Sequence, residues 1–316
     1  MPQPSSPEPH EAHSIPRHLL PKIEFFLRLI QNGGPHPHEY EHLSNWTREL
    51  SSALHDQPEL FAKVSRIWRN WSYDYLEGSV QHMVVAKPHG YHGDFEIIDR
   101  MYCETISNEP HLARWDKYFY DLSAPRAVRN RKKYFHQLLS RAVTASASGS
   151  LCVLNVASGP GRDMREWFES RPDAQVRFDC VELDPNAIAH ASRLCADYLH
   201  SIRFHETNAL RFKTDDRFHL IWSAGLFDYL SDSLFVRLLK SFIKHSLPGG
   251  EIVIGNFGEH NPSRFYMELG GWRLFHRSAD HLLSLAGRAG VAGERAHIGS
   301  ESEGVNLFLH VKCPEE

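Results

Sequence analysis

Residues 151–170 have the sequence LCVLNVASGPGRDMREWFES, and this stretch decides the fold. Its first part, 151–157, is an apolar run that predicts a buried strand. A turn of small residues follows from Ser158 to Gly161, and Asp163 is expected to cap a helix with apolar residues at helical spacing. A strand, a glycine turn and a helix in this order are typical of a site that holds a nucleotide-like ligand at the carboxyl end of a parallel sheet.

The alternation of strand and helix continues to the end of the sequence. The remaining strands are expected at 176–182, 202–205, 218–223 and 251–256, with two weaker ones near 295–299 and 305–311. Helices are expected at 163–170, 186–199, 232–246 and 279–289. Such alternation implies an α/β fold with a mostly parallel sheet that is covered on both faces.

Composition divides the 316 residues into three expected parts. Residues 1–16 are rich in Pro, Ser and Glu and are expected to form a disordered tail. Residues 17–124 carry a helical pattern, including a helix over 58–83, and predict an N-terminal helical cap. Residues 125–316 contain the strand–helix alternation and form the expected core.

The net charge and the distribution of apolar residues argue against several classes of partner. A formal net charge of −4 favours neither nucleic acid nor an anionic membrane surface. No apolar run approaches the ~20 residues that span a bilayer, so no stable membrane insertion is expected. The five cysteines are scattered without a CxxC pair, as in a cytoplasmic protein with reduced thiols. The oligomeric state is left open.

One histidine pair has the spacing of a zinc motif. His38-Glu-Tyr-Glu-His42 matches HExxH, which places two ligands on one helix face. Here the motif follows a Gly-Pro sequence and falls in the first turn of its helix, and no third histidine follows at the expected spacing. We therefore expect surface histidines and no metal.

The expected ligand contains a ribose but no pyrophosphate. The second strand ends at Glu182, whose carboxylate can accept hydrogen bonds from both ribose hydroxyls. Met164 stands where a dinucleotide fingerprint has its third glycine, and no phosphate-binding lysine motif is present. Asn208 follows the third strand, where its amide could reach an adenine edge. S-Adenosylmethionine fits this combination best.

The motifs together resemble a known family. The class I S-adenosylmethionine-dependent methyltransferases have motifs like Asn155-Val-Ala-Ser-Gly-Pro-Gly161, Val181-Glu-Leu-Asp-Pro185, Asn208 and Leu247-Pro-Gly-Gly250. Further stretches resemble the bacterial extracellular-factor 3-hydroxypalmitic acid methyl ester biosynthesis proteins: 87–94, 127–131, 223–230, and 255–257 with 261–268. The resemblance implies a helical cap and a seven-stranded Rossmann-like sheet whose last strand is antiparallel.

It also implies roles for individual residues. The expected cofactor contacts are Asn155, Ser158, Gly159, Gly161, Glu182, Asp184, Asn208, Ser223, Ala224 and Gly225. The expected catalytic residues are Tyr229, Asn256, Tyr91 and Tyr266. The expected substrate-binding residues are His92, Asp94, Arg131, Asp228, His260 and Glu268.

The expected reaction is methyl transfer to a small molecule, such as the carboxylate of a hydroxy fatty acid or of a secondary-metabolite acid. A carboxylate is ionised near neutral pH and needs no base, whereas an amine or phenol would need one. The sequence lacks the Asn/Asp-Pro-Pro-aromatic signature of amino-nitrogen methylation. Two alternatives stay open. One is a cyclase that converts the cofactor into azetidine-2-carboxylate and methylthioadenosine, and the other is a non-catalytic regulator that binds the cofactor.

Overall fold

The structure is a computed structural model that describes residues 15–146 and 149–315. Contacts divide the chain into two units. The first comprises residues up to Arg126 together with Pro262–Arg273, and the second comprises Ala127–Asn261 and Leu274–Glu316. Residues 262–273 thus group with the N-terminal helices, although they lie in the sequence range expected for the core. The tail expected at 1–16 lies outside the described residues except for its last two positions. The boundary expected near residue 124 stays a prediction.

The first unit is helical and is built around one apolar core. Phe26 packs among Trp46, Trp68, Trp71 and Trp115, with ring centroids 5.5 to 6.3 Å apart. The helices are α2 (Leu20–Gln31), α3 (Tyr40–Leu54), α4 (Pro58–Tyr75), α5 (Val80–Ala86), α6 (Phe95–Cys103), α7 (Pro110–Asp121) and α12 (Arg264–Leu269), with a short 3-10 turn at Pro37–Glu39.

The single helix expected over 58–83 is two helices in the structure. Gly78 adopts φ +95°, which a helix does not allow, and Ser79 caps the new helix by accepting a hydrogen bond from the His82 N–H at 3.1 Å. The carboxylate of Asp116 accepts a second hydrogen bond at this break, from the Val80 N–H at 2.8 Å. The apolar periodicity continues through the break and therefore conceals it.

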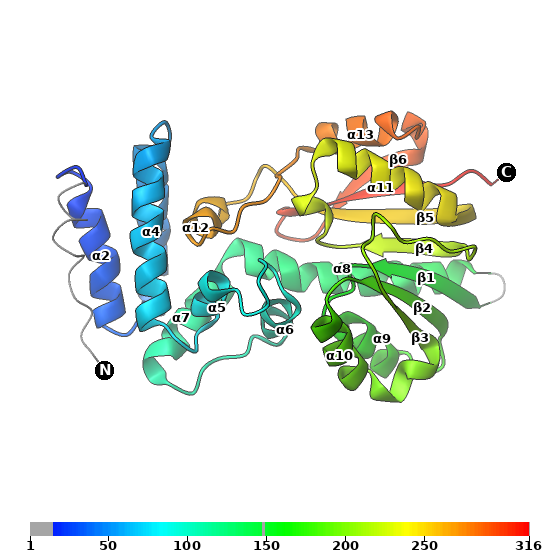
Figure 1. Cartoon of the computed structure of the whole chain (residues 1–316), viewed down its shortest axis with the longest axis horizontal. Coiled ribbons are helices and arrows are strands. Elements are labelled where there is room, and N and C mark those ends of the chain that lie inside the picture. The colour runs from blue at the N-terminus through cyan, green and yellow to red at the C-terminus, as the bar shows by residue number, and fades with distance from the viewer. Residues whose placement is uncertain (1–14, 147–148, 316) are drawn as a thin grey trace. The chain divides into compact units, whose positions relative to one another are not determined.

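The second unit contains a seven-stranded sheet with the strand order β3-β2-β1-β4-β5-β7-β6 (Figure 1). Strands β1 to β5 pair in parallel, and β7 is antiparallel to both β5 and β6. The α/β class and the Rossmann-like, mostly parallel seven-stranded sheet are therefore confirmed. The strands are β1 (Ser150–Val156), β2 (Gln175–Glu182), β3 (Ile202–Glu206), β4 (Phe218–Ser223), β5 (Ser246–Phe257), β6 (Ala296–Ser300) and β7 (Asn306–Lys312).

Helices cover both faces of the sheet because side chains alternate along the strands. Leu154 and Val156 belong to the same apolar cluster as helices α11 (Asp232–His245) and α13 (Ala279–Arg288). Val153 belongs to the opposite cluster, with α8 (Ser123–Ala145) and α9 (Arg162–Ser170). Helix α10 (Pro185–Leu194) follows β2. No helix in the described parts of the chain is long and apolar enough to cross a membrane.

Two boundaries in the second unit differ from the expectation. Helix α9 begins at Arg162 with Gly161 as its N-cap, so Asp163 lies in the first turn and does not cap the helix. Strand β5 begins at Ser246, whereas the sequence predicted a stop at Pro248-Gly-Gly250 and a strand from Glu251. The pairing register shifts at this point, so the Pro-Gly-Gly segment is accommodated inside the strand as an irregularity.

Candidate active site

The glycine turn after β1 lies where the strand order changes direction. β1 pairs with β2 on one side and with β4 on the other, and ligands of open parallel sheets bind at such a switch point. A Cβ atom on Gly161 would lie 2.9 Å from the Cβ of Ala191 in α10, and φ at Gly161 is +74°. A Cβ atom on Gly159, where φ is +58°, would meet no atom within 4 Å. Gly161 therefore allows α10 to approach closely, and Gly159 faces open space.

Glu182 at the end of β2 joins this turn. Its Oε2 accepts a hydrogen bond from the Gly159 N–H at 3.0 Å. Its Oε1 accepts from the N–H groups of Leu183 at 2.8 Å and Asp184 at 3.1 Å. Because a carboxylate has about four acceptor positions, these three bonds orient Glu182 and leave capacity for a ligand hydroxyl.

Asn155, near the end of β1, has a buried side-chain amide whose hydrogen bonds are incomplete within the described residues. Its side chain is 2% exposed, and its Nδ2 has no hydrogen-bond partner among residues 15–146 and 149–315. Buried donors almost always have a partner, so this donor suits an acceptor atom of a bound molecule. On β4, Ser223 Oγ donates to the Val156 carbonyl at 3.0 Å and ties the two strand ends together. The residues at this switch point therefore fit a ligand with hydroxyls and a polar end.

The other expected cofactor residues surround the same strand ends. Asp184 caps α10 by accepting from the Asn186 N–H at 2.8 Å. Asn208 Oδ1 accepts from the Leu210 N–H at 2.9 Å, which fixes the turn after β3. The Ala224 carbonyl accepts a hydrogen bond at 3.3 Å from Nη1 of Arg131, a side chain that is 7% exposed. Ser158 is also buried in the turn. The structure thus gathers the expected cofactor residues around one edge of the sheet, and their ligand roles stay predictions.

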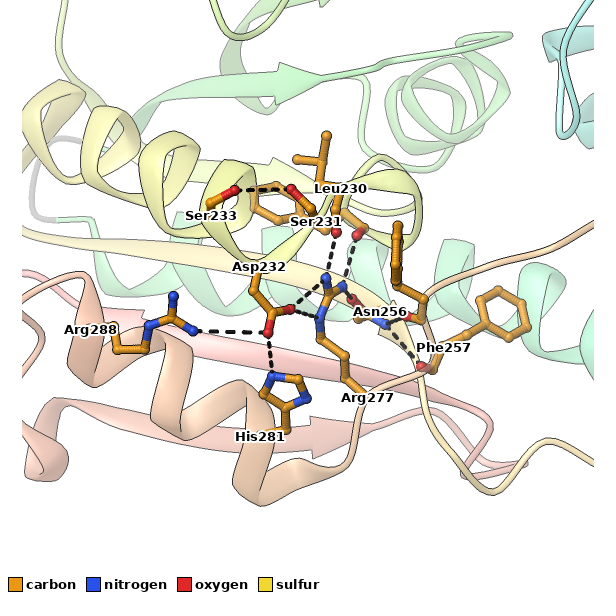
Figure 2. Close-up of polar contacts among 11 residues, drawn as sticks. Leu230, Ser231, Asp232, Ser233, Asn256, Phe257, Arg277, His281 and Arg288 are labelled. Atoms are coloured by element: carbon orange, nitrogen blue, oxygen red, sulfur yellow. Dashed lines mark hydrogen bonds and ion pairs between the residues drawn. The ribbon is translucent and has the colours of Figure 1, made fainter.

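A buried cation organises the loops after β4 and β5, and no motif or periodicity of the sequence indicates it. Figure 2 shows Arg277 at the centre of this network. Its guanidinium donates to the Asn256 Oδ1 at 2.7 Å, to the Phe227 carbonyl at 3.0 Å and to the carbonyl of Leu230. It also pairs with Asp232 at 3.1 Å, and Asp232 in turn contacts His281 at 2.9 Å. Arg277 is 1% exposed, so these bonds replace the hydrogen bonds that its guanidinium would form with water.

The contacts of Asn256 make it a positioning residue. Its Nδ2 donates to the carbonyls of Phe257 and Phe275, each at 2.9 Å, while its Oδ1 accepts from Arg277 (Figure 2). The side chain is fully buried. Its hydrogen bonds therefore hold the loop around Phe275 to the end of β5, and they do not support the catalytic role expected for it.

Asp228 lies beside this network as a buried acid. It is 2% exposed, and its Oδ1 accepts from the Phe257 N–H at 2.6 Å. Burial raises the pKa of Asp228 to about 7, although the Phe257 hydrogen bond and the charges of Arg131 and Arg277 act in the opposite direction. A proton on this side chain therefore favours the folded state.

We expect Asp228→Asn to stabilise the protein at pH 8 by an amount on the order of 2 kcal/mol. The folded-state pKa lies above the unfolded value, so this group's contribution to stability is full below about pH 4 and is lost as pH rises through about 7. Asparagine keeps an oxygen for the Phe257 N–H and carries no charge. The difference in melting temperature from the wild type should therefore be positive at pH 8 and small at pH 4.5.

The matched control is Asp232→Asn. That carboxylate is paired with Arg277 and His281, so its neutralisation should lower the melting temperature at pH 8. A melting temperature of Asp228→Asn at or below the wild type at pH 8 would show that the charged form is the one that the fold stabilises.

Several expected acceptor-site residues belong to the first unit and have partners there. The Tyr266 hydroxyl donates to Gln81 Oε1 at 2.5 Å, and burial raises the pKa of Tyr266 well above its ordinary value. Asp94 caps α6 by accepting from the N–H groups of Glu96 and Ile97, each at 3.0 Å. These contacts account for the Tyr266 hydroxyl and for Oδ1 of Asp94, whereas the buried Oδ2 of Asp94 has no hydrogen-bond partner among residues 15–146 and 149–315.

The remaining expected residues are more accessible. His92 stacks on Trp272 with ring centroids 5.9 Å apart, and burial lowers its pKa to about 4, so its imidazole is neutral at pH 7. Glu268 forms an ion pair with Arg264 at 2.8 Å. Three further side chains are exposed: Tyr91, Tyr229 and His260. Across the described ranges, no group of three His, Cys, Asp or Glu side chains could hold a metal ion.

Comparison with known proteins agrees with this geometry. Residues 153–250 match the family model described as a methyltransferase domain. Among solved structures, the chain is similar to a possible exported protein from Bordetella parapertussis, with 20% identity, a TM-score of 0.62 and coverage of 80% of this chain and 95% of that one. A search of curated proteins found no match.

Two further structures share the fold. The CMeT domain of the citrinin polyketide synthase is 15% identical, with a TM-score of 0.51 and coverage of 86% of this chain and 69% of that one. Magnesium protoporphyrin IX methyltransferase from Synechocystis PCC 6803, solved with bound S-adenosylmethionine, is 9% identical, with a TM-score of 0.50 and coverage of 79% and 97%. These structures agree with the chain in fold, and the match of residues 153–250 to the methyltransferase-domain model indicates an enzyme that uses S-adenosylmethionine.

Proposed function

We propose that the protein transfers the methyl group of S-adenosylmethionine to the carboxylate of a small molecule, such as a hydroxy fatty acid or a secondary-metabolite acid. The observation that carries the cofactor side is the hydrogen bond from the Gly159 N–H to Glu182 at 3.0 Å, together with the buried Nδ2 of Asn155, which has no partner in the described part of the chain. In this proposal Glu182 accepts from a ribose hydroxyl, Asn155 donates to a polar atom of the cofactor, and Asn208 lies at the adenine edge. When bound, the cofactor supplies an electrophilic methyl group on a sulfonium.

The acceptor side of the proposal depends on Arg131. Its guanidinium is 7% exposed and lies against the end of β4, where a Cβ atom on Gly225 would be 3.1 Å from Nη1. A guanidinium in a low-dielectric site attracts a carboxylate and can orient it with two parallel N–H donors. A carboxylate needs no general base, so the chain's task is to position the oxygen in line with the methyl group and to limit water. We propose that Tyr229, next to the buried Asp228, contributes to this positioning.

The comparisons do not favour the two alternatives, cyclisation of the cofactor and a non-catalytic regulator. We further propose that the enzyme works in the cytoplasm, because all five cysteines are free thiols in the structure, which suits a reducing compartment.

The test is a product analysis of the purified protein with S-adenosylmethionine. The acceptors are 3-hydroxy fatty acids of graded length and aromatic hydroxy acids, each paired with its primary amide as a matched control. We expect S-adenosylhomocysteine with the acids and not with the amides, together with a methyl ester that mild alkali cleaves. A product that resists alkali would overturn the carboxylate acceptor. Methylthioadenosine in a reaction without acceptor would overturn methyl transfer in favour of cyclisation.

A further inference from the structure

A groove in the second unit lies outside the glycine-turn site. It runs between the segment 210–213, which follows β3, and helix α11, and it has a volume of about 650 Å³. Four apolar side chains contribute to its lining: Leu210, Phe212, Val236 and Leu238. We call this feature the basic groove because five Arg and Lys side chains line it. A groove of this size with apolar lining is large enough to receive side chains of another molecule.

Five cations line the two walls of the basic groove. Arg237, Lys240 and Lys244 lie three and seven residues apart on α11, so they form one row of about 10 Å along that helix. Arg211 and Lys213 belong to the opposite wall. All five side chains are exposed, and no Asp or Glu lines the groove. This density of positive charge contrasts with the net charge of −4 for the whole chain.

These five cations also differ from several basic residues of the unit that have acidic partners. Arg203 is paired with Asp179 and Asp216, Lys132 with Glu166, and Arg277 with Asp232. None of the five groove cations forms an ion pair or a side-chain hydrogen bond within the described parts of the chain. Burial, with contributions from the charges of Arg217 and Lys244, lowers the pKa of His245 at one end of the groove. The groove therefore carries positive charges that no Asp or Glu in the described parts of the chain pairs with.

We propose that the basic groove docks an acidic amphipathic helix of a partner protein. Apolar side chains of that helix would enter the groove and contact the apolar lining, and its carboxylates would meet the two rows of cations. Such a helix presents an apolar stripe flanked by charges, which is the complement of an apolar floor between two charged walls. A phosphate backbone would leave the apolar lining without a partner, and a flat membrane surface does not fit a concave one. The proposal is independent of the methyl acceptor.

The probe is a synthetic peptide with Leu at helical spacing i, i+3, i+4 and i+7 and with Glu on both flanks, labelled with fluorescein. Its binding to the full-length protein is measured by fluorescence anisotropy at low and high salt. We expect the charge reversal Arg237→Glu/Lys240→Glu/Lys244→Glu to weaken binding at least tenfold, and salt to weaken binding to the wild type. The matched control is Lys117→Glu/Arg193→Glu/Arg295→Glu, which reverses three exposed cations outside the groove and should leave binding unchanged.

Four results would overturn the proposal. One is the absence of measurable peptide binding to the wild type, and another is an equal loss in both triple variants, which would indicate a general charge effect. The third is equal binding of a peptide of the same composition with the apolar stripe scrambled. The fourth is tighter groove-dependent binding of single-stranded DNA or of phosphatidylserine vesicles, which would assign the groove to a different class of partner. Circular dichroism of each variant verifies that it is folded.

Discussion

Replacing Arg277 with alanine is expected to lower the free energy of unfolding of the second unit by about 3–5 kcal/mol. The substitution removes the donor of Asn256 Oδ1 and of the carbonyls of Phe227 and Leu230. It also removes the ion pair with Asp232, which keeps its contacts with His281 and Arg288. Buried acceptors without donors bear the full cost of lost hydration, which is about 1–3 kcal/mol for each group. The guanidinium also lies over the ring of Phe235 at 5.1 Å, so packing is lost as well.

The matched control for this prediction is Arg288→Ala. Arg288 reaches the same carboxylate at 3.9 Å, but its side chain is 53% exposed, and pairs of this kind contribute roughly 0–1 kcal/mol (Figure 2). Chemical denaturation followed by tryptophan fluorescence measures both variants, and hydrogen exchange at residues 227–230 locates the effect. Similar stabilities for the two variants would contradict the central role of Arg277.

The sheet could be predicted from the sequence because its signals are local. An apolar run such as 151–157 forms a buried strand where helices cover both faces of a parallel sheet, and β1 is found at Ser150–Val156. The proximity of Glu182 to the glycine turn could also be predicted. The carboxyl ends of two neighbouring parallel strands, β1 and β2, lie at the same edge of the sheet. The break at Gly78 cannot be predicted from the apolar periodicity, because the three- and four-residue spacing of apolar side chains continues from the first helix into the second.

The polar network could not be predicted, for a physical reason. Arg277 lies 45 residues from Asp232 and 21 from Asn256 in the chain, and no periodicity links the three. Asn256 was expected to be catalytic from its place at a strand end, but its hydrogen bonds depend on a loop that only the tertiary fold brings there. Tyr266 is similar, because its hydroxyl is bound by Gln81, 185 residues away. Positions at strand ends are predictable, whereas the partners of individual polar side chains are not.

Glu182→Ala is expected to weaken the binding of S-adenosylmethionine by roughly 1.5–3 kcal/mol, which corresponds to about a ten- to hundredfold higher Kd. A hydrogen bond from a neutral donor to a charged acceptor has this range, and the proposed donor is a ribose hydroxyl. Isothermal titration calorimetry with S-adenosylmethionine and S-adenosylhomocysteine measures the change. The loss should be similar for both ligands, because the ribose is common to them. An unchanged Kd for either ligand would remove Glu182 from the cofactor site.

A lower affinity could also arise indirectly, because Glu182 holds the glycine turn by accepting from the Gly159 N–H at 3.0 Å. Two measurements separate these causes. Gly161→Ala disturbs the same turn through the contact with Ala191 and a strained φ, and it leaves the carboxylate in place. If Glu182 acts on the ribose directly, Glu182→Ala should lower the melting temperature of the ligand-free protein less than Gly161→Ala does, and yet weaken cofactor binding at least as much. If the two variants lose affinity in proportion to stability, the carboxylate acts only by shaping the turn.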